Sequence, residues 1–211
     1  MVLTIVSLAQ DAASELIYPL LPLLVAGVVG AAPLALGVIE GSAEFAAGFM
    51  KLYSGKLSDR FGRKPFVIGG YSLTGVGKVF TVFSLSWPGI YAGRVLDRIG
   101  KGMRGTPRDA LIHDGVSDKD LGKAFGFHRA GDNFGAVIGP LTALILLYAL
   151  NNDVRAVAKW ALIPAAISAL FTLFVKDAKP HEQRVTFSKV PLSPVLKRTI
   201  ALLVLVQLTN I

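Results

Sequence analysis

The stretch Gly55-Lys56-Leu57-Ser58-Asp59-Arg60-Phe61-Gly62-Arg63-Lys64 decides the fold class of this chain, because it is a short basic loop between two long apolar segments. Its two glycines permit a tight turn and a close approach of backbones. Asp59 stands among four basic side chains, so the loop can hold two helix ends together by ion pairs and release them. The alternative interpretation is a basic loop that only orients its flanking helices and contains one stabilising ion pair.

The composition around this loop is that of a membrane protein. Hydrophobic residues make up 53% of the 211 residues and charged residues only 17%, whereas a soluble domain is about 25% charged. This excludes a soluble enzyme. The net charge of +8 would suggest nucleic acid as a partner, but the basic residues form three clusters separated by the apolar segments, so we predict no such partner. Cysteine is absent and the three histidines are scattered, so we expect no metal site and no cofactor.

The hydropathy pattern predicts six membrane spans, because a bilayer core about 30 Å thick requires about 20 apolar residues per helix. The spans form an amino-terminal bundle over residues 1–176, with approximate bounds 2–29, 34–58, 65–85, 87–107, 122–150 and 156–175, and the fourth runs toward Pro107. Residues 177–198 are a basic connector. Residues 199–211 start a seventh helix that is too short to span, so we expect the chain to be truncated.

The basic clusters also predict the orientation. They follow the second, fourth and sixth spans, and loops rich in lysine and arginine stay in the cytoplasm. The amino terminus and the connector are therefore expected to be cytoplasmic, in a multi-pass protein of the inner or plasma membrane. A cleavable signal peptide is not expected, because no basic start precedes the first apolar run.

The loop between the second and third spans resembles the signature of the major facilitator superfamily: Gly55, three residues, Asp59-Arg60, one residue, Gly62-Arg63-Lys64. This resemblance implies an all-α integral membrane fold, namely a six-helix amino-terminal half built as a 3+3 inverted repeat. It also implies secondary active transport of a small solute by alternating access. The run from Arg94 to Asp109 is similar to a bacterial and archaeal subgroup of the family, although Arg98 stands where a glycine is usual.

Basic residues line one face of the fourth span. They recur at intervals of four, three, three and four residues, which places them on one helix face: Arg94, Arg98, Lys101, Arg104 and Arg108. We expect Arg94 and Arg98 to line the transport route, with Asp97 neutralising part of the charge. Arg104 and Arg108 are expected to extend toward lipid headgroups. The alternative is a salt-bridged helix interface.

Carboxylates in the first, second and fifth spans are candidates for proton coupling, because buried acids exchange protons when their surroundings change. Glu15 ranks first because it lies deep in apolar sequence. The further candidates are its neighbour Asp11, the pair Glu40 and Glu44, and Asp132 with His128 and Arg129 on its face. The alternative for each acid is structural pairing with Arg94, Arg98 or Lys78.

Glycines in the fifth span recur every four residues and precede a proline: Gly131, Gly135, Gly139 and Pro140. Such a ridge allows close helix packing, and it is similar to part of the signature of exporters in the family, which favours efflux. Expected partners are lipid, a small-molecule substrate, protons, and either a missing carboxyl-terminal half or a second copy. Two alternatives remain open: a half-size transporter working as a homodimer, and a membrane scaffold or sensor that does not transport.

Overall fold

The structure is a computed structural model that describes residues 1–175 together with residues 198, 199 and 202. Residues 1–179 form one compact unit and residues 180–211 a second, so each unit is described by itself. In the second unit, Arg198, Thr199 and Leu202 are helical. The rest of the predicted connector and seventh helix lies outside the described residues.

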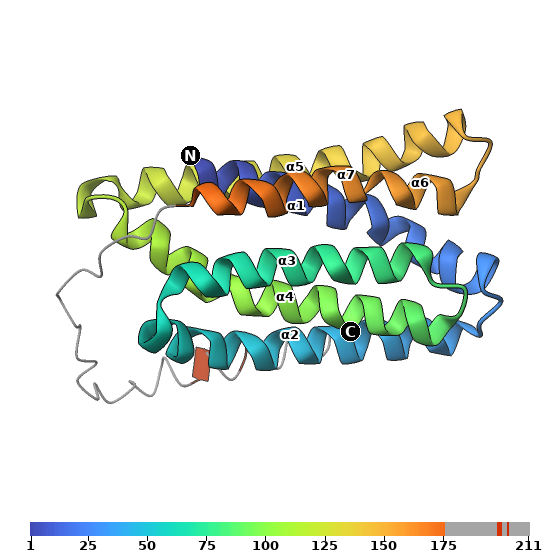
Figure 1. Cartoon of the computed structure of the whole chain (residues 1–211), viewed down its shortest axis with the longest axis horizontal. Coiled ribbons are helices and arrows are strands. Elements are labelled where there is room, and N and C mark those ends of the chain that lie inside the picture. Colours follow the sequence, from blue (N-terminus) through green and yellow to red (C-terminus); the bar gives the residue numbers. More distant parts are fainter. Residues whose placement is uncertain (176–197, 200–201, 203–211) are drawn as a thin grey trace. The chain divides into compact units, whose positions relative to one another are not determined.

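The first unit is a bundle of long helices (Figure 1). The first span is α1 (Val2–Ile17), a 3-10 turn η1 (Tyr18–Leu20) and a π-turn η2 (Leu23–Val28), and the next are α2 (Pro33–Phe61), α3 (Arg63–Phe83) and α4 (Trp87–Asp114). A short η3 (Asp118–Asp120) leads to α5 (Leu121–Ala149), and the sixth span is α6 (Val154–Trp160), α7 (Leu162–Phe171) and η4 (Thr172–Phe174). Pro19 and Pro22 lie where the first span changes its winding, because a proline nitrogen donates no helical hydrogen bond.

Two predictions about helix ends are wrong. The fourth helix does not end at Pro107 but continues to Asp114, because contacts of Arg104 and Arg108 with α1 and α5 hold the turns on both sides of the proline. The loop between the second and third spans is also much shorter than expected. Only Gly62 separates α2 from α3, and its φ of 93° makes the turn. Lysine and arginine are good helix formers, so most of the loop sequence is helical.

Three helical stretches of the described residues are long and apolar enough to cross a membrane by length and composition: Arg63–Phe83, Asp118–Ala149 and Val154–Phe174. The other three predicted spans differ for identifiable reasons. The first span changes winding after Ile17, and the helices α2 and α4 carry charged side chains along their length. Many of these charges pair with one another inside the bundle, as Arg94 of α4 does with Glu40 of α2.

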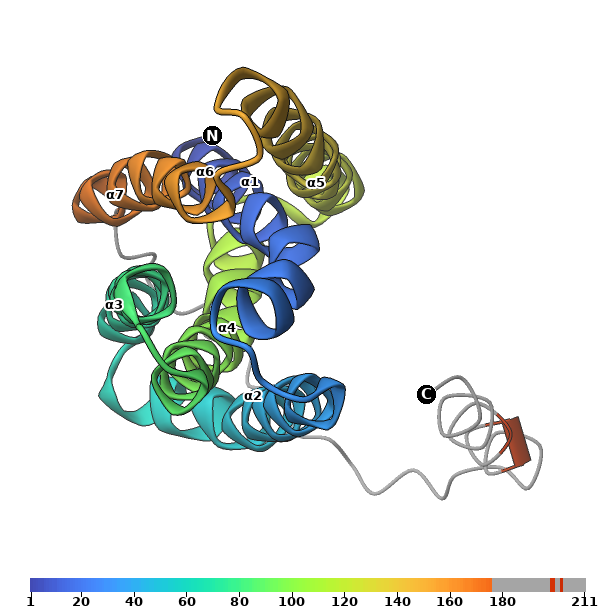
Figure 2. The same cartoon turned by 90° about the vertical axis from the view of Figure 1, so that its right-hand side faces the viewer.

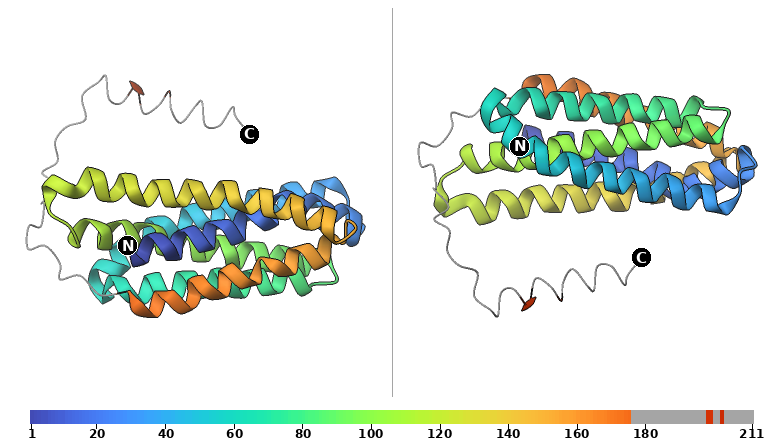
Figure 3. Two further views of the ribbon diagram at one scale, coloured as in Figure 1. Left: turned by 90° about the horizontal axis from the view of Figure 1, so that it is seen from above. Right: turned by 90° about the horizontal axis from the view of Figure 1, so that it is seen from below.

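The helices of the first unit form two groups of three spans. α1 packs against α5 and α7, and α4 packs against α2 and α3 (Figures 1 and 2). Figure 3 shows the same helices from two sides, with α2 and α5 extending along most of the bundle. The first span therefore contacts the fifth and sixth, just as the fourth contacts the second and third. If spans one to three and spans four to six are two related units, the first helix of each unit packs against the second and third helices of the other unit.

Glycines set the closest helix contacts. A Cβ atom on Gly77 would lie 2.6 Å from the Gly93 carbonyl oxygen, so α3 and α4 touch backbone to backbone. The predicted ridge on α5 lies against α1: a Cβ on Gly135 would lie 2.5 Å from the Leu8 carbonyl oxygen, and one on Gly139 2.7 Å from the Ala12 carbonyl oxygen. Larger side chains cannot occupy these positions without separating the helices.

Candidate functional site

A buried ion-pair cluster joins the first halves of α2 and α4 to the second half of α3, away from the turn at Gly62. The Arg94 guanidinium donates two hydrogen bonds to Glu40, at 2.8 Å to Oε1 and 2.9 Å to Oε2, and a third to Asp97 at 3.3 Å. Lys78 Nζ donates to Asp97 Oδ1 at 2.7 Å and to the Ser14 hydroxyl of α1 at 2.9 Å. The two-pronged Arg94–Glu40 contact has the geometry of a strong ion pair.

The same cluster continues along α2 through Arg98, whose Nε lies 3.0 Å from Glu44 Oε1 and whose Nη2 lies 3.8 Å from Glu40 Oε2. Three cations thus face three carboxylates. A balanced, hydrogen-bonded cluster is the form in which ionised groups are tolerated in a low-dielectric interior. It ties α4 to α2 and α3, and through Ser14 to α1.

A second cluster lies nearer the end of the bundle where α2 meets α3, which we call the loop end. Arg104 lies 3.6 Å from Asp11 of α1, and its guanidinium stacks 4.3 Å above the Tyr71 ring. Arg108 donates to the Ser7 hydroxyl at 2.9 Å and lies 3.6 Å from Asp132 of α5. The basic face of α4 therefore meets α2 in one half of the bundle and α1 with α5 in the other.

The prediction that Arg104 and Arg108 extend toward lipid headgroups is wrong. Only 2% of Arg104 and 8% of Arg108 is exposed. Both side chains are retained inside the bundle because carboxylates on other helices neutralise them, and because Ser7 and Tyr71 satisfy further parts of the guanidinium groups.

A cavity of about 460 Å³ opens between α1, α2, α4 and α5. Charged side chains from all four helices line it, and small residues form much of the remaining wall: Asp11, Glu44, Ala47, Gly48, Lys51, Lys101, Gly102, Arg104, Gly105, Arg108, Asp109, Arg129, Asp132, Asn133 and Ala136. Its size falls in the range of about 300–1,000 Å³ that is typical of small-molecule sites. The cavity therefore collects acids and bases from the predicted coupling and substrate residues into one space.

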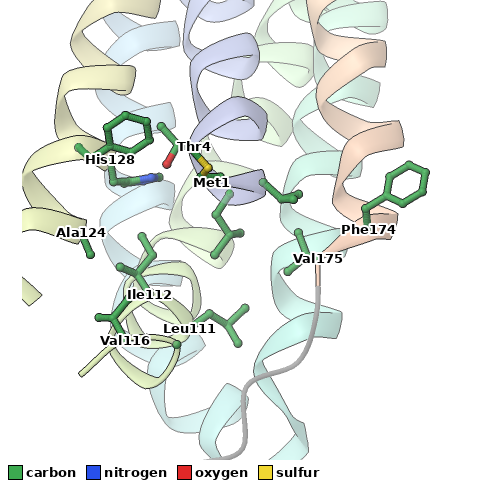
Figure 4. A pocket seen from close by; sticks show the side chains of 13 residues that line it. Met1, Thr4, Leu111, Ile112, Val116, Ala124, His128, Phe174 and Val175 are labelled. Atoms are coloured by element: carbon green, nitrogen blue, oxygen red, sulfur yellow. The ribbon is translucent and has the colours of Figure 1, made fainter. Parts of the chain in front are cut away.

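A second, mostly apolar pocket of about 340 Å³ lies near the loop end, between the start of α1, the end of α4, the start of α5 and η4 (Figure 4). His128 lines it and faces Thr4 of α1, and 2% of the residue is exposed. His128 Nε2 lies 3.6 Å from Asp132 Oδ1, which is too long for a hydrogen bond. One turn of α5 thus separates the apolar pocket from the charged cavity.

The signature residues between α2 and α3 make their main contact with the end of α4. The Arg63 guanidinium donates to the Asp114 carboxylate and, at 2.9 Å, to the Ala110 carbonyl oxygen. Asp59 lies 3.7 Å from Arg63, and 67% of its side chain is exposed. Gly55 does not turn the chain; a Cβ there would lie 3.1 Å from a Thr106 methyl group, so it permits α2 to approach α4. Arg63 and Asp114 therefore form the principal contact.

Some predicted site residues remain apart from these clusters, and the clusters include residues that were not predicted. Glu15 makes no ion pair within 4.0 Å among residues 1–175; Arg129 reaches Asp132 only at 4.0 Å. Ser7, Ser14 and Asp114 were not among the predicted site residues, and Lys78 was predicted only as a possible partner of the acids. The sequence does single out Lys78, since it is the one charged residue within the predicted span 65–85. The described residues contain no group of three or more His, Asp or Glu placed to hold a metal ion.

Comparison with known families decides the classification. The family model of the Major Facilitator Superfamily matches residues 3–210. The chain belongs to this superfamily. It has the fold of the amino-terminal half of a superfamily transporter. The solved structure of the xylose transporter XylE from E. coli matches it with a TM-score of 0.71 at 19% identity. The match covers 84% of this chain and 47% of XylE. The chain is thus a membrane protein of a transporter family.

Relatives of known sequence agree with this assignment. The chain is 34% identical to an uncharacterized MFS-type transporter, MJ1317, of Methanocaldococcus jannaschii, over 86% of this chain and 46% of the relative. It is 26% identical to the multidrug resistance protein MdtH of Salmonella newport, over 77% of this chain and 40% of the relative. The chain thus spans less than half the length of these superfamily members.

Proposed function

We propose that this superfamily member is the amino-terminal half of a secondary active transporter that moves a small solute by alternating access, coupled to protons. The observation that carries the proposal is the cavity of about 460 Å³, in which carboxylates of α1, α2 and α5 meet the basic face of α4. A second bundle, either a carboxyl-terminal half or a second copy, closes the cavity on its open side. Transporters of this kind bind substrate between two such bundles.

Proton coupling follows from the pairing of the cavity acids. Asp11 is held by Arg104 at 3.6 Å and Asp132 by Arg108 at 3.6 Å. A proton on either carboxylate removes the charge that holds the arginine, and loss of the proton restores the pair. Proton binding in the cavity thereby changes how tightly α4 is tied to α1 and α5. These two acids take precedence over Glu15, which does not line the cavity.

The remaining details are also proposals. The basic clusters favour a cytoplasmic loop end in an inner or plasma membrane. The partial glycine–proline pattern of α5 and the similarity to multidrug resistance proteins favour efflux.

The test is proton flux in vesicles reconstituted with the full reading frame that encodes this chain. An outward substrate gradient, generated with each member of a substrate panel, should move protons in the opposite direction. Asp11→Asn and Asp132→Asn should each reduce the flux at least about tenfold. Asp118→Asn is the matched control, because Asp118 lies exposed in η3, away from the cavity. Undiminished substrate-driven flux in both cavity variants would refute the coupling, and absence of solute movement would refute transport.

A further inference from the structure

The charges that line the cavity are unequally neutralised. Each of its four acids has a basic partner within 4.0 Å: Asp11 with Arg104, Glu44 with Arg98, and both Asp109 and Asp132 with Arg108. The two lysines in the lining, Lys51 and Lys101, have no acid within that distance among residues 1–175. The uncompensated charge of the described wall is therefore positive.

Lys101 occupies the more demanding of the two positions. It lies at the middle of α4, which runs from Trp87 to Asp114. A cation at the middle of a membrane helix is costly unless water or an anion compensates it. Its neighbours along the basic face, Arg98 and Arg104, are both occupied by carboxylates. Lys101 instead lines the cavity, and the residue is exposed.

The wall beside Lys101 leaves room for a ligand. Gly102 packs against the α2 backbone, but a Cβ on Gly48 or on Gly105 would meet nothing within 4 Å. Ala47 and Ala136 add two further small side chains to the lining. An ammonium with three donors next to an open, small-residue wall is suited to pair with a compact anionic group, such as a carboxylate or a phosphate, rather than with a cation.

From this arrangement we infer that the cavity binds a small organic anion, whose carboxylate or phosphate group pairs with Lys101. This inference rests on the proposed function, because it names the class of solute that the cavity takes. Lys51 adds attraction on the α2 side of the cavity. An organic cation would have to approach a wall on which every described acid is already paired, so it is disfavoured. A neutral sugar would leave the Lys101 charge uncompensated.

The experiment measures binding to the full reading frame in nanodiscs of zwitterionic phosphatidylcholine, which provide no anionic headgroup. The probes are benzoate and citrate as carboxylates, inorganic phosphate and glycerol 3-phosphate as phosphates, xylose as a neutral solute, and ethidium as a cation. We expect one of the two anion classes to bind at millimolar concentration or below. Lys101→Gln should weaken this binding about tenfold or more, as expected for the loss of one charge-assisted contact. Lys101→Arg should retain most of it.

Lys123→Gln is the matched control, because Lys123 is exposed and its nearest acid is Asp120, outside the cavity. It should bind the anion like the unmodified protein. Unchanged anion binding by Lys101→Gln overturns the role of Lys101. Binding of xylose or ethidium without binding of any anion overturns the anion class but leaves the transport proposal intact. Solute-driven proton flux without anion binding has the same two consequences. Absence of both binding and flux overturns the proposed function itself.

Discussion

The Lys78–Asp97 pair provides a quantitative test of how the bundle holds its charges. Both side chains are almost completely buried, at 2% and 5% exposure, and their charged atoms are 2.7 Å apart. Removing one partner of a buried ion pair typically costs about 3–5 kcal/mol, because the other charge stays in the interior. The two partners differ, however, in what remains after the substitution.

Asp97→Asn leaves the buried Lys78 ammonium with neutral acceptors only, including the Ser14 hydroxyl, so we expect the whole loss of about 3–5 kcal/mol in unfolding free energy. Lys78→Met leaves Asp97 with Arg94 at 3.3 Å. The loss should then be smaller, about 1–3 kcal/mol. The double variant removes both charges together and should lose less than the sum of the two single losses, with a coupling of about 2 kcal/mol.

The assay is reversible unfolding of the protein in mixed detergent micelles, followed by circular dichroism. Lys123→Met with Asp120→Asn is the control cycle, since these two side chains are 87% and 57% exposed and 3.7 Å apart; its coupling should be near zero. Equal losses for the two buried single variants, or strictly additive losses in the double variant, would refute the reasoning.

Further predictions concern helix packing and the contact at the loop end. Gly139→Val should lower the unfolding temperature strongly, because a Cβ at this position would lie 2.7 Å from the Ala12 carbonyl oxygen. Gly126→Ala should not lower it, because a Cβ there would meet nothing within 4 Å. Thermal melts of the two variants test this difference. Asp114→Asn should loosen Arg63 and speed tryptic cleavage between α2 and α3, while Asp59→Asn, at an exposed side chain, should have little effect. Equal cleavage rates in these two variants would contradict the assignment of Asp114 as the main partner.

The long elements of this fold are predictable from hydropathy and from the residues that turn the chain between the spans. Apolar runs of about 20 residues and their turn residues place all six helical spans within a few residues at most ends, since a span needs that length. The exceptions have local causes. Pro107 resembles a helix end until the contacts of Arg104 and Arg108 are known, and residues 55–61 resemble a loop because they are polar, although they continue α2 for two more turns.

The site is less predictable, because periodicity shows which residues share a helix face but not which face of another helix they meet. The five basic residues of α4 are recognisable as one stripe. Their partners depend on how α1, α2 and α5 are rotated about their own axes. For this reason Glu15 and Asp11, one turn apart on α1, separate into a residue without an ion pair among the described residues and a residue of the cavity wall. Single polar residues such as Ser7 and Ser14 give no sequence signal of this kind.

The charge pattern of α4 has a consequence for the order in which the protein is made. Three of the acids that neutralise its basic face, Asp11, Glu40 and Glu44, belong to helices synthesised before α4, but Asp132 belongs to α5, which follows it. When α4 leaves the ribosome, counter-ions for its first half are already in the membrane. Arg108 has Asp109 of its own helix as a partner, at 3.0 Å, and gains Asp132 as a second partner only when α5 arrives. We therefore expect insertion of α4 to be cooperative with the earlier helices, and the contact of Arg108 with Asp132 to form only when α5 enters the bilayer.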